Sequence, residues 1–251
     1  MVCRTRGQWP KGVVVGAIDG RQATPATSGH ERAVREEVEF FSGPDLVFGC
    51  RHTPLGGAVT GVVVCSPLPY QTGAAYLPDA RLGRQLSRAG VVVQRFHYRG
   101  TGHSDGDPAG LTLDAMAHDA RDALAHLRHR CGVDRVGVMG TAAGAAVAAL
   151  VARDLPGAPV ALWEPFEPAT PDHRLTDLLG TGPRPLLVAA AGLGAAGEVG
   201  SAGGLADDVT AWRSQAFDVQ IVPPVGVPGG PGLVETTAAW FVRQLPAREQ
   251  G

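Results

Sequence analysis

The feature that most constrains the fold is a series of six short, nearly continuous apolar runs that alternate with segments of helical periodicity. Such runs suit strands that are buried on both faces of a parallel sheet. They span residues 59–65, 91–96, 135–139, 159–163, 185–190 and 219–222. A different pattern precedes them, because two β-type segments, 34–41 and 46–52, are joined by turn-forming residues and predict an antiparallel hairpin.

The segments between the apolar runs predict helices. The clearest is 113–127, where apolar residues recur at steps of three and four on one stripe. Further helices are expected at 79–88, 143–153, 207–215 and 233–244. This alternation predicts an α/β fold with a doubly wound, mostly parallel sheet of about eight strands and helices on both faces. Ligands of such sheets bind at the carboxyl ends of the strands, so the loops after residues 65, 97, 139, 163, 190 and 222 should converge.

Length and composition favour one domain, since 251 residues with 44% hydrophobic content can bury a single core. Residues 1–31 show no sustained period and are predicted to be a disordered leader, which leaves 32–251 as the domain. The net charge of −2, with both signs interspersed, indicates neither a nucleic-acid nor a membrane partner. One lysine against 21 arginines, with no asparagine, indicates a bacterial genome of high GC content.

The four cysteines lie far apart and have no zinc-type spacing, which favours free thiols in a reducing compartment and no metal site. Histidines 118, 126 and 129 share one predicted helix and are interpreted as part of its polar face. No apolar segment is long enough to span a membrane, and no signal peptide is evident. We therefore expect a cytoplasmic protein without a cofactor.

Three motifs occur in order along the chain. Ser66-Pro67 follows the run at 59–65, the segment 96–104 has the sequence Phe-His-Tyr-Arg-Gly-Thr-Gly-His-Ser, and Gly140-Thr141-Ala142-Ala143-Gly144 follows the run at 135–139. Together with the hairpin, they resemble the α/β-hydrolase superfamily over roughly residues 34–245. The resemblance is strongest to its serine aminopeptidase and exosortase-associated hydrolase-like branch.

This resemblance implies that residues 140–144 form the nucleophile elbow, which in the family has the pattern Gly-x-Ser-x-Gly. The nucleophile position is then Ala142, which cannot form an acyl-enzyme. The loop expected to carry the catalytic histidine, 223–232, has none, and the loop expected to carry the acid, 191–197, has no carboxylate. An engineered serine-to-alanine variant would have kept its histidine, so we interpret the triad as naturally lost.

The resemblance also implies an oxyanion-binding corner that can outlast the triad, because its donors are backbone N–H groups. One belongs to the residue after the nucleophile position, Ala143. The other lies in the loop at 66–68, where Pro67 cannot donate, and Leu68 is the expected donor.

Three side chains are candidates for remaining chemistry. His97 is either a general base, since its pKa lies near working pH, or a structural histidine under the elbow. Ser66 is either a substitute nucleophile or polar clamp, or a residue that caps its loop. Glu164 follows the run at 159–163, where some members of the family carry an alternative acid.

Four further residues are candidate pocket residues. Thr141 either orients a ligand or satisfies its own turn. Trp163 and Phe166 either wall a pocket together with Glu164 or form a packed aromatic pair. Tyr98, in the segment 96–104, completes the set.

The segment 164–184, between two predicted strands, has only about twenty residues, whereas many family members insert a lid domain there. We therefore expect an open crevice, which suits a substrate carried on a larger object, such as an acyl carrier protein, or a partner protein's loop, rather than a small ligand sealed from water. The expected partner is a small molecule or an acyl substrate bound to a carrier protein. Three hypotheses remain: a non-hydrolytic enzyme acting on a carbonyl or acyl compound in bacterial specialised metabolism, a non-catalytic binder of a small molecule or protein, and a residual esterase or thioesterase using Ser66 with His97.

Overall fold

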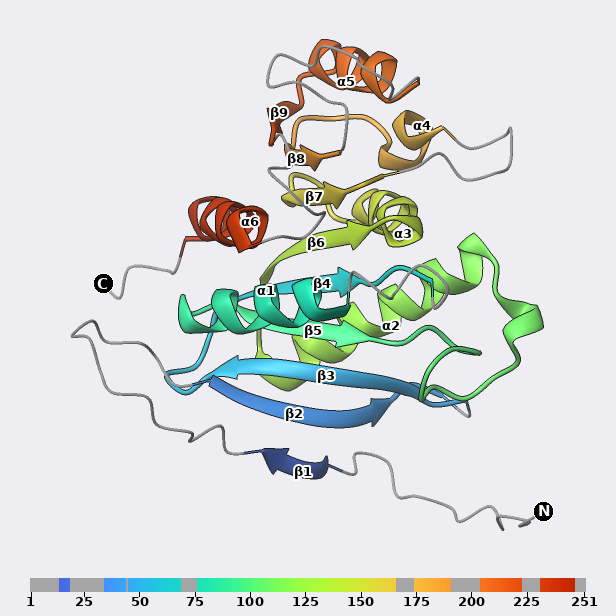
Figure 1. The fold of residues 1–251 in the computed structure, drawn as a ribbon, viewed down its shortest axis with the longest axis vertical. Helices are drawn as coiled ribbons and strands as arrows, with labels where there is room; N and C mark the ends of the chain where they lie inside the picture. Colours follow the sequence, from blue (N-terminus) through green and yellow to red (C-terminus); the bar gives the residue numbers. More distant parts are fainter. Residues whose placement is uncertain are drawn as a thin grey trace.

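The computed structural model describes residues 14–18, 34–43, 45–68, 76–165, 174–190, 204–222 and 231–246. Within them one sheet of nine strands runs through the molecule in the order β1-β2-β3-β5-β4-β6-β7-β8-β9 (Figure 1). The strands are β1 (Val14–Ile18), β2 (Val34–Phe41), β3 (Val47–Pro54), β4 (Thr60–Cys65), β5 (Val92–Phe96), β6 (Arg135–Thr141), β7 (Val160–Trp163), β8 (Pro185–Ala189) and β9 (Asp218–Ile221). β1, β2 and β3 pair antiparallel, whereas β4 to β9 run parallel.

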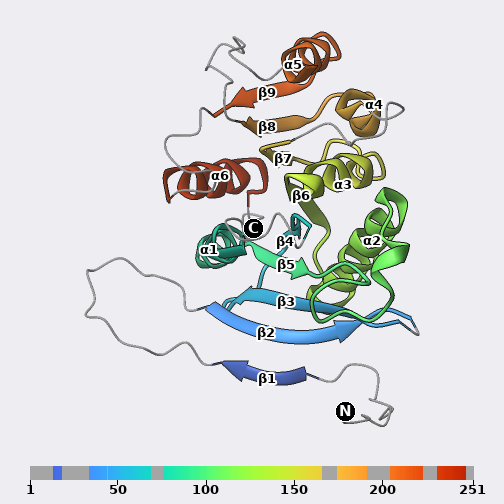
Figure 2. The same cartoon turned by 45° about the vertical axis from the view of Figure 1, so that its right-hand side comes forward.

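Six α-helices cover both faces of this sheet in the described residues. They are α1 (Tyr76–Arg88), α2 (Leu113–Cys131), α3 (Ala143–Ala152), α4 (Leu175–Leu179), α5 (Gly204–Ser214) and α6 (Pro231–Gln244), and a short 3₁₀ helix, η2, spans Pro108–Gly110. α1 and α6 pack on one face, while α2, α3, α4 and α5 pack on the other (Figure 2). The predicted doubly wound α/β architecture is therefore confirmed.

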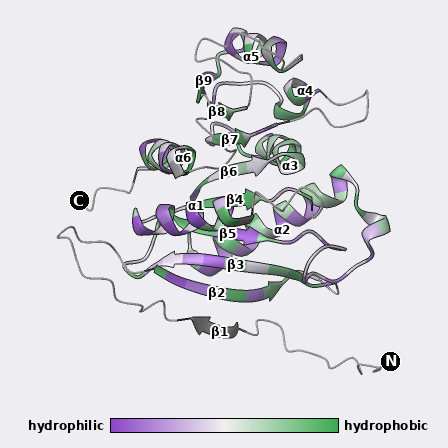
Figure 3. Ribbon diagram, in the orientation of Figure 1, coloured by the Kyte–Doolittle hydropathy of each residue, from purple (hydrophilic) through white to green (hydrophobic). Residues whose placement is uncertain are grey.

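The central strands are apolar along their whole length because helices cover both of their sides. All six residues of β4 are buried. Val62 and Val64 point into the core under α1 and α6, whereas Val63 and Cys65 point into the core under α2 to α5. Figure 3 shows the hydrophobic colour concentrated on these inner strands and more hydrophilic colour on β2 and β3.

β1 departs from the leader predicted over residues 1–31. Val14–Ile18 pairs antiparallel with β2, with Val14 opposite Glu39. The edge of β2 offers unpaired backbone groups, and a short β-prone apolar segment can satisfy them. These five residues belong to the sheet, while residues 1–13 and 19–33 lie outside the described part of the chain.

The connection between β7 and β8 is short. Only 21 residues, 164–184, separate the two strands, and the five-residue helix α4 is part of them. This length leaves no room for a separate lid domain. α4 itself was not predicted, because five residues are too few to show helical periodicity.

Among the described residues, no helix combines the length and the apolar character that crossing a membrane requires.

Candidate functional site

The turn between β6 and α3 has the sharp geometry of an elbow. Ala142 adopts φ 53° and ψ −119°, a conformation that non-glycine residues rarely occupy and that costs about 1–3 kcal/mol. A Cβ atom on Gly140 would lie 2.0 Å from the Gly144 carbonyl oxygen, and one on Gly144 would lie 2.0 Å from the Cys65 carbonyl oxygen. Both glycines are therefore required, and the strained turn is maintained although its central residue has no hydroxyl.

The elbow leaves the start of α3 without a side-chain cap. The Ala142 N–H donates to the Trp163 carbonyl at 2.9 Å, and the Ala142 carbonyl accepts from the Ala145 N–H at 2.9 Å. Ala143 is the first residue of α3, and the first N–H groups of a helix have no partner within it. They also form the positive end of the helix dipole, which favours a negative or polarised oxygen. Ala143 therefore occupies the position expected of an oxyanion donor.

A buried carboxyl group lies beside the elbow. Asp79, in the first turn of α1, is 1% exposed. Its Oδ2 accepts a hydrogen bond from the Ser66 hydroxyl at 3.1 Å, and its Oδ1 accepts one from the Thr141 hydroxyl at 3.5 Å. Burial raises the pKa of Asp79 to about 7, against the opposing effects of Arg95 and of the two hydroxyl groups. The carboxyl group is thus balanced between its protonated and ionised forms near neutral pH.

Asp79 was not among the predicted site residues. The sequence indicated only that a helix begins there, and acidic residues are common in the first turn of helices. The available signal was its place just after the loop that follows β4, one of the six loops expected to converge. The structure brings Ser66 and Thr141, which were predicted separately, together on this one carboxyl group.

Comparisons with known proteins bear on this arrangement. No family model matches the sequence, and no curated protein matches it. Among solved structures, an α/β serine hydrolase homologue from Coxiella burnetii has a TM-score of 0.60 at 21% identity, over 83% of this chain and 96% of that one. Dienelactone hydrolase from Anabaena variabilis has a TM-score of 0.61 at 16% identity, over 84% of this chain and 99% of that one. A serine hydrolase without a lid from Xanthomonas campestris has a TM-score of 0.60 at 18% identity, over 85% and 97%.

The chain has the α/β-hydrolase fold. Within this fold, the elbow at Ala142 lies where the resemblance places the nucleophile. The branch of the superfamily expected from the sequence stays a prediction.

Tyr98 holds the backbone of the site at Ser66. Its hydroxyl donates to the Ser66 carbonyl at 3.0 Å, and its ring packs edge-on against Phe96. Tyr98 is 2% exposed, and burial raises its pKa well above the usual value. This tyrosine therefore holds the Ser66 peptide in place and offers little surface to a ligand, which differs from the predicted pocket role.

His97 is held by the loop that follows β5, through His103 and Ser104. Its Nδ1 accepts from the His103 N–H at 3.1 Å, and its ring packs against Phe48. Burial, followed by His103 and Arg95, lowers the pKa of His97 to about 4. Because Nδ1 is an acceptor, the neutral ring carries its hydrogen on Nε2. This geometry favours the structural alternative over the general base.

Trp163 belongs to the core. It is 1% exposed, and its indole N–H donates to the Thr237 hydroxyl of α6 at 3.0 Å. The structure thus places it in the packed interior and not on the wall of a pocket, because its ring points to the face covered by α6. Glu164 is half-buried after β7 with φ 43°, and its N–H donates to the Ala189 carbonyl at 2.6 Å. Phe166 lies outside the described residues.

Ser66 and His97 line a common small cavity of about 10 Å³ together with Arg95, Cys50, Phe48 and Phe96. This volume holds about one water molecule. The Ser66 hydroxyl donates to Asp79, and no hydrogen bond joins Ser66 to His97 in the described residues. Leu68, the second expected oxyanion donor, lies at the end of the described part of its loop, half-buried against the core.

Three potential metal ligands, Glu36, Cys50 and His52, gather under α1. They fit a metal ion poorly, because Arg95 Nε donates to His52 Nε2 at 3.0 Å and Arg84 Nε pairs with Glu36 at 2.5 Å. A histidine that binds a metal through Nδ1 must carry a hydrogen on Nε2, yet here Nε2 accepts one. The cluster is therefore better described as a buried polar network that holds Arg95.

The loop expected to carry the acid, 191–197, lies outside the described residues, as do residues 223–230 of the loop expected to carry the histidine and His173. Their predicted vacancy rests on the sequence.

Proposed function

We propose that this protein is a non-hydrolytic enzyme that removes a proton from a carbon atom of a carbonyl or acyl compound and returns it. The observation that carries the proposal is the Asp79 carboxyl group, whose pKa is raised to about 7 and which accepts hydrogen bonds from the hydroxyls of Ser66 and Thr141 beside an elbow without a nucleophile. An acid–base group works best when its pKa lies near the working pH.

The reaction follows from the two parts of the site. The N–H of Ala143 polarises the carbonyl oxygen of the substrate, as the oxyanion corner does in acyl transfer. Asp79 accepts a proton from the carbon next to that carbonyl through the Ser66 or Thr141 hydroxyl, which passes on its own proton as it receives one. In a β,γ-unsaturated substrate the product is a dienolate, and protonated Asp79 returns the proton through the same hydroxyl to its γ-carbon, which moves the C=C bond next to the carbonyl and regenerates the carboxylate. In a saturated substrate the proton returns to the same carbon, which appears as exchange with solvent. Such an isomerisation needs no co-reactant and no covalent intermediate.

The substrate class is a small carbonyl compound or an acyl group borne on a carrier protein. The short β7–β8 connection supports the second option, because a lidless edge accommodates a bulky carrier. A role in bacterial specialised metabolism and a cytoplasmic location remain part of this proposal.

A non-catalytic binder is the alternative, and one observation favours it: Asp79 is only 1% exposed, so a ligand reaches it only through the two hydroxyls. Residual hydrolysis by Ser66 with His97 has less support, because the Nδ1 of His97 already accepts the His103 N–H.

One assay separates the proton-transferring enzyme, the non-catalytic binder and the residual hydrolase. Acyl thioesters of N-acetylcysteamine, which mimic carrier-bound acyl groups, are incubated with the protein in D₂O. Deuterium entering next to the carbonyl is followed by NMR, and released thiol by a colorimetric reagent. The proposal expects deuterium incorporation by the wild type, its loss in Asp79→Asn, and thiol release at the buffer rate. Thiol release above that rate contradicts it, and thioester binding without exchange favours the binder.

A further inference from the structure

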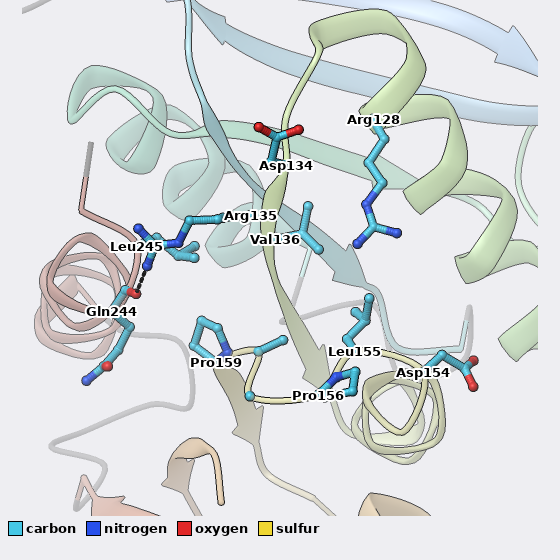
Figure 4. A pocket seen from close by; sticks show the side chains of 12 residues that line it. Arg128, Asp134, Arg135, Val136, Asp154, Leu155, Pro156, Pro159, Gln244 and Leu245 are labelled. Carbon is cyan, nitrogen blue, oxygen red and sulfur yellow. Dashed lines mark hydrogen bonds between the residues drawn. The ribbon is translucent and has the colours of Figure 1, made fainter. Parts of the chain in front are cut away.

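Arg95, on β5, is a buried cation beside the candidate site. It is 7% exposed and lines the same small cavity as Ser66. By contrast, Arg128 and Arg135 are exposed at the cavity of about 280 Å³ that lies at the amino ends of β6 and β7 (Figure 4). A guanidinium that is removed from water destabilises the fold unless a carboxylate compensates its charge. A compensating carboxylate is therefore expected near Arg95.

Arg95 lies under the helix that carries Asp79. It points to the face of the sheet that α1 covers, because it alternates with Val93, which packs there. Its Nε donates to His52 Nε2 at 3.0 Å. The His52 ring lies against Gly83 of α1, where a Cβ atom would come within 2.7 Å of it. Asp79 and Gly83 are four residues apart and share one face of α1, so His52 and Asp79 flank the same stretch of helix.

His52 holds the guanidinium without neutralising it. Burial, followed by the Arg95 charge, lowers the pKa of His52 to about 3, so its Nε2 remains a hydrogen-bond acceptor at neutral pH. Its Nδ1 then carries the hydrogen and lies 3.8 Å from Glu36 Oε1. A neutral ring fixes the direction of the Arg95 side chain, but the balancing charge has to come from a carboxylate.

Two carboxyl groups have their pKa lowered by the Arg95 charge, Glu36 and Asp79. Glu36 already pairs with the Arg84 Nε at 2.5 Å and is partly exposed. Asp79 is 1% exposed, and the hydrogen-bond donors that the described residues supply to it are the hydroxyls of Ser66 and Thr141. Asp79 is therefore the carboxyl group whose ionisation depends on Arg95.

The other titratable groups that sense Asp79 are uncharged near neutral pH. They are Cys65, at the end of β4, and Tyr98, after β5, and burial raises the pKa of both. Both therefore remain protonated when Asp79 ionises. Within the described part of the chain, Arg95 is the charged side chain that acts on Asp79.

We propose that Arg95 is a positioning residue of the candidate site: held by His52, it supplies the positive charge that keeps the Asp79 carboxylate available as a base near neutral pH. Its role in a reaction rests on the proposed function, whereas its coupling to Asp79 is a property of the fold. Arg95 acts through Asp79 and does not touch the substrate. Without this charge, burial would retain the Asp79 proton to a higher pH.

The titration of Asp79 tests the coupling without a substrate. Protein labelled with ¹³C at its aspartate carboxyl groups is titrated by NMR, and the Asp79 resonance is identified by its absence in Asp79→Asn. The wild-type midpoint should lie near pH 7. We expect it to be about one pH unit higher in Arg95→Gln and close to the wild-type value in Arg95→Lys, which retains the charge.

Arg84→Gln is the matched control. Arg84 acts on Glu36 and His52, whereas the pKa of Asp79 is shifted by Arg95 and the two hydroxyls. The midpoint of Asp79 should therefore stay unchanged in Arg84→Gln. An unchanged midpoint in Arg95→Gln, or an equal rise in Arg84→Gln, would overturn the proposal.

A second readout uses the wild-type side chain and decides the matter even if Arg95→Gln does not fold. The Arg95 Nε–H resonance, identified by its contact with the His52 ring, should shift with the midpoint of Asp79 and lose this dependence in Asp79→Asn. The neighbours of Arg95 titrate elsewhere, since the pKa values of Glu36 and His52 are lowered and that of Cys50 is raised. A resonance that stays constant between about pH 5.5 and pH 8.5 would overturn the proposal.

Deuterium exchange into the N-acetylcysteamine thioesters links the coupling to the reaction. Arg95→Gln should exchange about tenfold more slowly than the wild type at pH 6.5 and reach a similar rate at pH 8.5, and Arg95→Lys should restore the wild-type profile. A profile that does not move while the Asp79 midpoint does would overturn the role of Arg95 in the reaction. Absence of exchange in the wild type would contradict the proposed function, whereas the titration alone decides the coupling.

Discussion

The Ser66 hydroxyl donates a hydrogen bond to the buried Asp79 carboxyl group at 3.1 Å, directly after β4 and beside the turn that carries Ala142. Thr141, on the elbow itself, reaches the other oxygen of the same carboxyl group. Two loops of the sheet edge thus meet on one titratable group. A buried carboxyl group with a raised pKa lowers the stability of the fold when it is ionised. The raised pKa can therefore be tested through the pH dependence of unfolding, without knowledge of a substrate.

Replacing Asp79 by asparagine should stabilise the protein at pH 8 and leave it nearly unchanged at pH 4. The pKa of Asp79 is about 7 in the folded protein, whereas the ordinary value for aspartate is 3.8, so between these pH values the folded protein retains a proton that the unfolded chain has released. Stability from this group therefore falls as pH rises from 3.8 through 7. At about 1.4 kcal/mol for each tenfold change in the acid constant, the gain at pH 8 reaches about 4 kcal/mol.

Urea unfolding of Asp79→Asn at both pH values measures this difference. Asp114→Asn, an exposed acid in the first turn of α2, is the control and should show no gain at pH 8. A destabilised Asp79→Asn at pH 8 would contradict the assigned burial of the charge.

His52 should give the opposite dependence on pH. Burial, followed by the Arg95 charge, lowers its folded pKa to about 3 from 6.5. The unfolded chain then binds a proton that the fold excludes, so stability falls as pH drops from 6.5 toward 3. Between pH 7.5 and pH 4, His52→Gln, which retains an acceptor for Arg95, should lose about 3 kcal/mol less unfolding free energy than the wild type. Denaturant unfolding at the two pH values measures this difference, and His129→Gln, at an exposed histidine, is the control. A loss of stability in His52→Gln as large as in the wild type would contradict the lowered pKa of His52.

Gly140→Ala should prevent folding or destabilise the protein by more than about 4 kcal/mol, because the added Cβ would lie 2.0 Å from the Gly144 carbonyl oxygen. Gly110→Ala is the control, since no heavy atom lies within 4 Å of its Cβ position. Thermal unfolding of the two variants measures the contrast. Similar melting temperatures would mean that the elbow is looser than described.

Ala142→Ser should not produce an esterase. A serine hydroxyl is a weak nucleophile without a neighbouring base, and the nearby acid–base group, Asp79, is engaged by Ser66 and Thr141. Hydrolysis of p-nitrophenyl butyrate by this variant should stay at the buffer rate while the fold is retained by circular dichroism. Turnover above that rate would show that a base reaches the elbow.

The fold was predictable because its signals are local. Runs such as β4 and β5 are apolar at almost every position, and α2 has a clear stripe, so their type and order follow from periodicity. β1 could not be predicted, because its five residues form a strand only through the edge that β2 offers. α4 was missed because it is too short.

The site was predictable only where a motif carries it. The glycines around Ala142 identify the elbow, and the structure confirms the sharp turn. The chemistry of Asp79, on α1, depends on its burial and on contacts with Ser66 after β4 and Thr141 at the end of β6, which no local pattern encodes. For the same reason the sequence did not show that His97 packs against Phe48 or that Trp163 donates to Thr237, both of which lie far away along the chain.

We propose that no activated serine remains in this α/β-hydrolase fold. Intact mass spectrometry after incubation of the wild-type protein with a fluorophosphonate tests it most directly, since such probes react with activated serine nucleophiles. We expect an unmodified mass. A stoichiometric adduct, mapped by peptide analysis to Ser66 or any other serine, would contradict it.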